Sequence, residues 1–90
     1  MTIWKFPLKE EEQQVVEIPE INRPLTVQMQ AHTPCMWAVV DPDSPRIRIR
    51  LRTFGTGNPD VMAGHEYVGS YQTDIGVASL VFHVFVEGRA

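Results

Sequence analysis

The sequence has a single cysteine, Cys35, among its 90 residues and therefore cannot form an internal disulfide. A fold without disulfides depends on packing alone, which is typical of proteins in reducing compartments. No apolar run approaches the roughly 18 to 20 residues that a membrane-spanning helix needs. The first residues also lack the basic, apolar and small-residue order of a secretory signal. We therefore expect a cytoplasmic protein that has no membrane partner.

Motifs of catalysis and metal binding are scarce as well. The histidines His32, His65 and His83 are far apart, and no Cys or carboxylate accompanies them at a metal-ligand spacing. Cys35 opens an apolar segment, where thiols are usually inert, and no serine lies in a nucleophile elbow. We expect no enzyme, no metal and no other cofactor. We expect His83 to be a hydrogen-bonded core or interface residue.

No segment shows the residue spacing of an amphipathic helix. The chain is instead made of short extended segments. Seven segments alternate between apolar and polar residues or are apolar throughout, and turn residues separate them. They cover residues 2–8, 15–18, 25–30, 35–40, 46–54, 66–73 and 79–87. This pattern predicts one domain over residues 1–90, an all-β antiparallel sandwich or partly closed barrel with about seven strands. The two apolar runs, 35–40 and 79–87, predict central strands.

The segments between these strands carry turn chemistry. We expect residues 9–14, which are polar, to form a hairpin connection rather than a helix. Gly69 lies in the middle of a strand and predicts a bulge or a close approach of another backbone. Strict alternation around it places Tyr67 and Tyr71 on the same face. Further turns and loops are expected at residues 19–24, 31–34, 41–45, 59–65 and 73–78.

The positive charges are concentrated although the net charge is −3. Four of the eight Lys and Arg residues, Arg46, Arg48, Arg50 and Arg52, alternate with apolar residues along one predicted strand. Because successive side chains of a strand point to opposite faces, these arginines share one face at a spacing of about 6.6 Å. We call them the arginine face. The negative net charge of the chain disfavours long nucleic acid polymers as partners.

The arginine face and the turn that follows it suggest a site for an anionic ligand. Guanidinium groups bind phosphates and carboxylates through paired N–H donors, and they also stack on bases. The turn FGTG at 54–57 can cradle an anion with backbone N–H groups, although it lacks the other elements of dinucleotide and P-loop motifs. Trp37 can stack on a nucleotide ring. The predicted ligand-binding residues are Arg46, Arg48, Arg50, Arg52, Phe54, Gly55, Thr56, Gly57 and Trp37.

Each of these features also has a purely structural interpretation. The two glycines can serve a turn that needs positive φ, and Trp37 can be a core residue. The arginine face can be a solvated surface whose charges are balanced across strands. Its carboxylate partners would then be Glu10, Glu11, Glu12, Glu17 or Glu87.

Six segments of the chain together resemble a known family. They are WKFPL at 4–8, VQMQ at 27–30, PCMWAVVDP at 34–42, RTFGTGNP at 52–59, EYVGSYQ at 66–72 and LVFHVF at 80–85. The chain is similar, over nearly its whole length, to a family of small uncharacterised proteins that tailed phages and prophages encode. This resemblance implies a phage accessory protein rather than a part of the virion, and it supplies no catalytic residues. The arginine face contains more arginines than the family leads us to expect.

Three functions remain open at this stage. The first is a non-enzymatic phage protein that acts against host defence in the host cytoplasm by sequestering a nucleotide-type or other anionic immune signal. Its site would lie between the subunits of a homo-oligomer, because a core of this size has little room for a ligand. The second is a protein–protein inhibitor, in which an exposed strand edge or the arginine face docks on an acidic surface of a host protein. The third is a single-stranded nucleic-acid-binding module.

Overall fold

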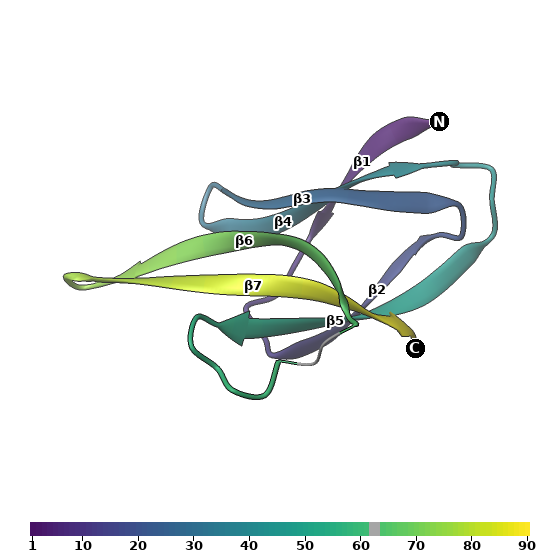
Figure 1. The fold of residues 1–90 in the computed structure, drawn as a ribbon. Helices are drawn as coiled ribbons and strands as arrows, with labels where there is room; N and C mark the ends of the chain where they lie inside the picture. The colour runs from purple at the N-terminus through teal and green to yellow at the C-terminus, as the bar shows by residue number, and fades with distance from the viewer. Residues whose placement is uncertain (62–63) are drawn as a thin grey trace.

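The computed structural model describes residues 1–61 and 64–90, with only the backbone at Ile75, and this part of the chain is entirely β-structure and turns (Figure 1). It contains no helix that is long and apolar enough to cross a membrane. The predicted all-β class is therefore confirmed. The strands are β1 (Thr2–Pro7), β2 (Gln13–Pro19), β3 (Asn22–Gln30), β4 (Thr33–Val40), β5 (Arg46–Gly55), β6 (Glu66–Ile75) and β7 (Ala78–Arg89).

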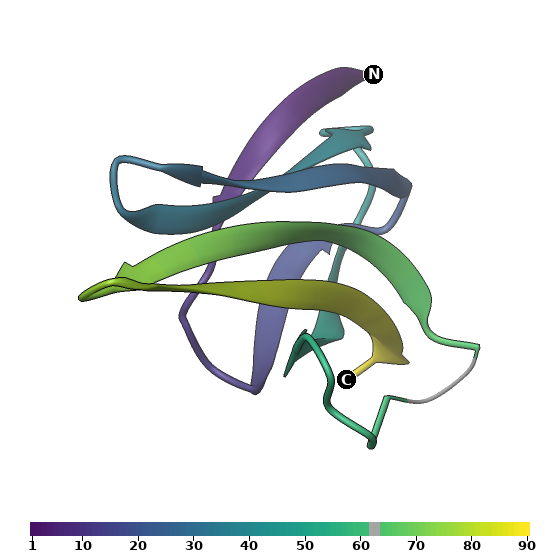
Figure 2. The ribbon, with the colours of Figure 1, turned by 60° about the vertical axis from the view of Figure 1, so that its left-hand side comes forward.

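The strands form two antiparallel sheets, with the orders β1-β4-β3 and β2-β5-β7-β6. In both ribbon views β3 lies beside β6, so the two sheets approach each other closely along this side (Figures 1 and 2). The arrangement is that of a sandwich, as predicted. The two apolar runs, now β4 and β7, occupy interior positions of their sheets, which confirms their predicted central place.

The core lies between the sheets and is built from alternate residues of the strands. Met36, Ala38 and Val40 of β4 are fully buried and face Leu51 of β5 and Val84 of β7 within one hydrophobic cluster. The apolar residues of the alternating segment in β5 therefore point inward, as predicted. The polar residues between them are directed to the outside of the sheet.

Residues 9–14 do not form the predicted hairpin connection. β1 pairs with β4 and β2 pairs with β5, so the segment between β1 and β2 crosses from one sheet to the other. The polar composition of residues 9–14 correctly predicted a connection at the surface. It could not predict which strands pair, because strand pairing depends on contacts between distant segments. This crossing brings the three glutamates of the segment beside β5.

Three other turns and loops are shorter than predicted. β4 already begins at Thr33, because Ala31 and His32 both adopt positive φ and close a two-residue turn. The predicted loop 73–78 is mostly strand, since β6 continues to Ile75 and β7 begins at Ala78. β3 begins at Asn22 and includes Pro24, which an edge strand tolerates. The predicted connection 59–65 includes residues 62 and 63, which lie outside the described residues.

Gly69 shows both of the features that its position predicted. The pairing of β6 with β7 shifts register between Tyr67 and Gly69, which marks a bulge. A Cβ atom at Gly69 would lie 2.7 Å from the backbone nitrogen of Val27 in β3. The bulge also overturns the prediction that Tyr67 and Tyr71 share a face. Tyr67 is exposed whereas Tyr71 belongs to the core, because the extra residue reverses the alternation.

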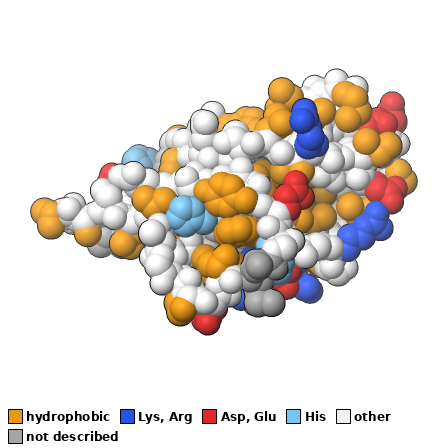
Figure 3. Space-filling model, viewed as in Figure 1, with side chains coloured by type: hydrophobic (Ala, Val, Ile, Leu, Met, Phe, Trp, Pro, Cys, Tyr) orange, Lys and Arg blue, Asp and Glu red, His pale blue; other side chains and the backbone are white. Residues whose placement is uncertain are grey.

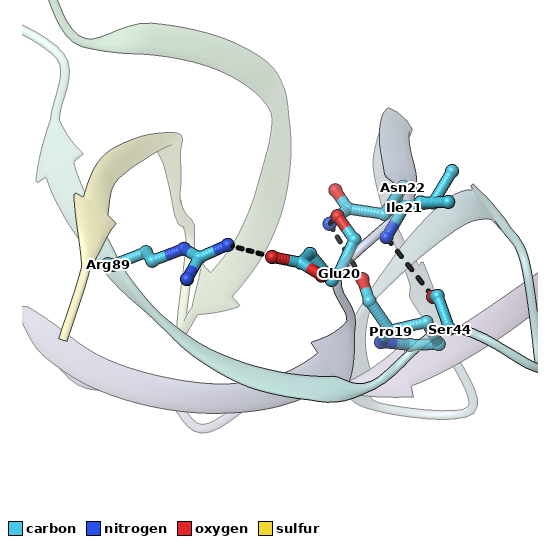
Figure 4. A network of polar contacts seen from close by, with 6 residues as sticks. All are labelled: Pro19, Glu20, Ile21, Asn22, Ser44 and Arg89. Atoms are coloured by element: carbon cyan, nitrogen blue, oxygen red, sulfur yellow. Dashed lines mark hydrogen bonds and ion pairs between the residues drawn. The ribbon is translucent and has the colours of Figure 1, made fainter.

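A network of polar contacts ties the end of β7 to the link between β2 and β3 (Figure 4). Nη2 of Arg89 lies 2.6 Å from Oε1 of Glu20, and the side-chain amide of Asn22 donates to the carbonyl of Pro19 at 2.8 Å. The backbone N–H of Ile21 donates to Oγ of Ser44 at 3.2 Å. These contacts hold the loop 41–45, and thereby the start of β5, against both sheets.

We predict that Gly69→Ala destabilises the fold by about 1 to 3 kcal/mol, because the new methyl group collides with backbone that has no room to move. The measurement is the free energy of unfolding in urea. Gly55→Ala is the matched control, since its Cβ would meet nothing closer than 3.8 Å, and it should change stability by less than about 0.5 kcal/mol. Equal effects of the two substitutions would contradict the proposed contact.

Candidate functional site

The arginine face lies on the outer surface of the larger sheet. β2 and β5 pair without interruption from Gln13 opposite Arg52 to Pro19 opposite Arg46, so the alternation of β5 is preserved. Glu17 lies opposite Arg48, and Val15 lies opposite Arg50. The four guanidinium groups nevertheless have different surroundings, and they do not act as one uniform ribbon.

Arg52, at one end of the face, is balanced by carboxylates of the same chain. Its Nη atoms lie 3.9 Å from Glu12 and 3.7 Å from Glu87, and its Cζ lies 5.3 Å from the ring centre of Phe54. Glu87 reaches this position because β7 bulges opposite Arg50 and Leu51. The side chain of Arg52 is only 23% exposed. The structural interpretation of the arginine face therefore holds for Arg52.

Arg46, at the other end, is held by neutral groups. Its Nη1 donates to the carbonyl of Pro42 and to the carbonyl of Ser44, both at 3.1 Å. Its Cζ lies 5.2 Å from the ring centre of Trp4, which is a cation–π distance. These neutral partners do not cancel the charge of Arg46, but the loop before β5 sets the direction of its side chain.

Arg48 and Arg50, in the middle of the face, have no such restraints. Within the described part of the chain, neither side chain forms an ion pair or a hydrogen bond. Arg48 is exposed and Arg50 is half-buried. Their donors are thus available to a group outside this chain.

The FGTG turn uses its backbone within the fold. The N–H of Thr56 donates to the carbonyl of Val81 at 3.1 Å, and the N–H of Asn58 donates to the carbonyl of Gly55 at 3.1 Å. Gly57 has a φ of 89°, which a residue with a side chain rarely adopts. One amide of the expected anion cradle, that of Thr56, is therefore already occupied, and Gly57 serves the turn.

Phe54 and His83 belong to an aromatic cluster that sequence reasoning missed. Phe54 is 2% exposed, and its ring packs edge-on against Phe85, with ring centres 5.8 Å apart. The ring of Tyr67 also packs edge-on against Phe85, with ring centres 5.1 Å apart. The two ring nitrogens of His83 lie 2.8 Å from Oγ1 of Thr56 and 3.1 Å from the hydroxyl of Tyr67. Figure 3 shows hydrophobic side chains around a histidine over β6 and β7.

This arrangement confirms that His83 is hydrogen-bonded, but the residue is only partly buried and does not belong to the core. Thr56 also donates to the carbonyl of Val81 at 3.3 Å, so its single proton is used there. Both ring nitrogens of His83 therefore have hydrogen-bond partners within the described chain.

Trp37 is not brought to the arginine face. It lies on β4, in the smaller sheet, with Lys5 and Thr26 as its neighbours on the adjacent strands. Met36 and Ala38 on either side of it face the core, so Trp37 is directed to the outside of the smaller sheet. The two surfaces lie on opposite sides of the sandwich.

A pocket of about 400 Å³ lies beside the FGTG turn and has the opposite charge from the expected site. Three of its lining residues are glutamates, and none is a Lys, an Arg or a His. The densest acidic cluster of the sequence thus lines a cavity, which its spacing alone did not indicate. The lining residues are Glu10, Glu11, Glu12, Thr53, Gly55, Asn58, Tyr71, Thr73 and Phe82. We call this cavity the acidic pocket.

Two residues that line the acidic pocket, Thr53 and Tyr71, are buried and carry hydroxyl groups. Thr53 is 7% exposed and Tyr71 is 5% exposed. Oγ1 of Thr53 is a buried atom without a hydrogen-bond partner, and no described residue hydrogen-bonds to the hydroxyl of Tyr71. Burial, with a smaller contribution from Glu10, raises the pKa of the Tyr71 hydroxyl above its ordinary value of 10.0. Tyr71 is therefore neutral at physiological pH.

Comparison with known proteins identifies the family but no activity. A family model described as a domain of unknown function, DUF7352, matches residues 1–90. The chain belongs to this family. No curated protein and no solved structure matches the chain. Among the residues that the structure describes, no group of three or more His, Cys, Asp or Glu side chains could hold a metal ion.

We predict that Tyr71 ionises above pH 10.0 in the folded protein, because burial disfavours the phenolate. Absorbance near 295 nm measures the titration, and Tyr67→Phe leaves Tyr71 as the only tyrosine. Glu10→Gln should lower the midpoint in part, whereas Glu17→Gln on the other face should not. In the unfolded chain Tyr71 has its ordinary pKa and loses its hydroxyl proton at a lower pH than in the folded protein. The free energy of unfolding should therefore decrease as the pH rises above about 10. A midpoint at or below 10.0 would contradict the burial.

Proposed function

We propose that this DUF7352 protein is a non-enzymatic binding protein whose arginine face engages an anionic partner. The observation that carries the proposal is the state of Arg48 and Arg50. They are adjacent on the outer face of β5 and form no ion pair or hydrogen bond within the described chain, whereas Arg46 and Arg52 at the ends are engaged. Their forked donors match carboxylates and phosphates.

The shape of the surface favours an acidic region of another protein as this partner. Neither Arg48 nor Arg50 lines the acidic pocket or the two hollows next to it, so their guanidinium groups lie on an open sheet face. Beside them Val15 is 42% exposed on β2, which is an edge strand. A mixed apolar and cationic surface at a sheet edge suits docking of a protein, with charge determining the approach and the specificity.

A nucleotide-type small anion is the second candidate. Arg48 and Arg50 are separated along the strand by about 6.6 Å, a spacing at which two guanidinium groups can bind neighbouring phosphates. An open face buries little of a small ligand, so a second copy of the chain would have to cover it. This version of the proposal therefore requires a homo-oligomer. Single-stranded nucleic acid would need a continuous cationic track, and Glu17 interrupts this one.

The biological setting that we propose is a phage or prophage accessory protein acting in the host cytoplasm, against a host defence. The support is the resemblance of six sequence segments to small phage-encoded proteins. A non-enzymatic inhibitor of this kind needs only a surface that occupies its target. The arginine face supplies such a surface.

We predict that Arg48→Gln with Arg50→Gln weakens the interaction with an acidic protein partner by about tenfold or more, because two charge-assisted contacts are lost. The measurement is capture of proteins from host lysate by the immobilised chain, followed by titration of the captured protein. Binding by the unchanged chain should weaken as the salt concentration rises. The control pair, Arg23→Gln with Lys5→Gln, removes the same charge from the smaller sheet and should bind normally.

The small-anion version is separated by thermal unfolding with cyclic nucleotides and ADP-ribose derivatives. A rise in the unfolding temperature that disappears in the Arg48 and Arg50 variant, together with an oligomer in light scattering, would favour that version. Equal binding by the double variant and by the unchanged chain, for proteins and nucleotides alike, would overturn the role of the arginine face.

A further inference from the structure

β2 forms one edge of the larger sheet, and among the described strands it pairs only with β5. An antiparallel ladder alternates between residue pairs that exchange hydrogen bonds and pairs that do not. The backbone N–H of Thr53 donates to the carbonyl of Glu12, opposite it, at 2.9 Å, and that of Glu20 donates to the carbonyl of Pro45 at 2.7 Å. The even-numbered residues of β2 therefore hydrogen-bond to β5.

The odd-numbered residues of β2 direct their backbone groups to the free edge instead. These residues are Gln13, Val15 and Glu17, and each carries one N–H donor and one carbonyl acceptor. No turn, loop or side-chain hydrogen bond of the described residues uses these groups. Pro19 comes next and has no N–H, so it ends the row. The edge thus offers three donors and three acceptors to another strand.

The other edges of the two sheets are protected against the addition of a strand. β3 and β6 lie against each other, with no room for even a methyl group at Gly69. By the same alternation, Ile3, Lys5 and Pro7 face the free edge of β1. Lysine and proline are residues with which natural edge strands prevent pairing. β2 has no lysine and no bulge, and its one proline is its last residue.

The free edge of β2 is complementary to the same edge of a second copy. When two copies of β2 run antiparallel with Val15 opposite Val15, Gln13 of each copy lies opposite Glu17 of the other. Three hydrogen-bonded pairs then exchange six bonds, so every donor and acceptor of the row has a partner. A register shifted by two residues would bring in Pro19, which has no N–H, or Glu11, which lies outside β2. One register therefore satisfies the whole edge.

The charges along β2 favour the same register. Gln13 can donate its amide hydrogens to the carboxylate of Glu17 across the interface, so the two carboxylates do not face each other. β2 begins after the acidic residues 10–12, whereas its end lies opposite Arg46. Glu20, at this end, is already paired with a guanidinium group of β7. Antiparallel pairing thus brings the acidic start of one copy toward the cationic end of the other.

We propose that this protein forms a symmetric dimer in which the two β2 edges pair and the two four-stranded sheets become one continuous sheet. The twofold axis is perpendicular to this sheet, so both arginine faces lie on the same side. Arg50 of each copy then shares one row with the two Val15 side chains, and three strand spacings of about 4.8 Å separate the two arginines. Arg48 and Arg50 of the second copy complete the cationic surface. What this surface binds rests on the function proposed above, whereas the dimer does not.

The test is sedimentation equilibrium of the whole chain, in which we expect reversible association to twice the mass of the chain. Val15→Pro should raise the dissociation constant about tenfold or more, because it removes the two central hydrogen bonds. The fold should be retained, as far-UV circular dichroism can check, since the N–H of Val15 has no partner within the chain. Ile3→Pro makes the same change at the free edge of β1 and should leave the dissociation constant unchanged.

A second pair of variants tests the register without a proline. Gln13→Glu places two carboxylates opposite each other at both ends of the interface and should weaken the dimer about fivefold or more. Within the chain the new carboxylate lies opposite Arg52, so the fold should not be weakened. Gln13→Glu combined with Glu17→Gln exchanges the two side chains, and each carboxylate again faces an amide. This double variant should restore the dissociation constant to within about twofold.

Amide hydrogen exchange, measured by NMR, identifies the edge directly. The amides of Gln13, Val15 and Glu17 should become protected as the protein concentration rises, whereas that of Lys5 on β1 should not. A monomer at all concentrations, or a dimer that neither β2 variant weakens, would overturn the proposal. Protection of the β2 amides only after an acidic protein has been added would also overturn it. That result would show that a strand of the partner protein occupies the edge.

The dimer and the function proposed above fail in distinguishable ways. Val15→Pro keeps Arg48 and Arg50, so the anion-binding side chains are present with and without the dimer. A dimer that binds no anionic partner contradicts only the function of the arginine face. A monomer that binds such a partner contradicts only the dimer.

Discussion

The alternation of inward and outward residues along β5 is the constraint on which both surfaces depend. Ile49 and Leu51 are buried between the sheets, and burial of each such side chain contributes about 1.5 to 3 kcal/mol. An exposed ion pair contributes less than about 1 kcal/mol. The core therefore sets the register of β5. A shift of the β5 register by one residue would bury the guanidinium groups and expose the core residues. The loss of hydrophobic burial makes that register unfavourable.

Because of the same alternation, the cationic arginine face and the acidic pocket lie on opposite faces of β5. Arg52 points outward, and the next residue, Thr53, points inward to the acidic pocket. Glu12 belongs to both regions, because it lines the pocket and lies 3.9 Å from Arg52. Glu12 therefore lies at the boundary between the cationic outer face of the sheet and the acidic pocket.

The features that the sequence predicted are those that local alternation determines. The outward arginines of β5, the central places of β4 and β7 and the special role of Gly69 all follow from residue type and spacing. What failed depends on contacts between distant segments. Residues 9–14 cross between sheets because β2 pairs with β5, and Trp37 faces away from the arginines because β4 belongs to the other sheet. Neither pairing leaves a local signal.

The acidic pocket shows why residue type alone also misplaces a site. Valine has nearly the shape of threonine and a high preference for strands, so Val at position 53 would fill the same space without an unpaired hydroxyl. The buried hydroxyl of Thr53 costs about 1 to 3 kcal/mol if nothing bonds to it. The hydroxyl of Thr53 is thus a departure from the most stable choice at this position, and neither the residue type nor the alternation of β5 gives a sign of it in the sequence.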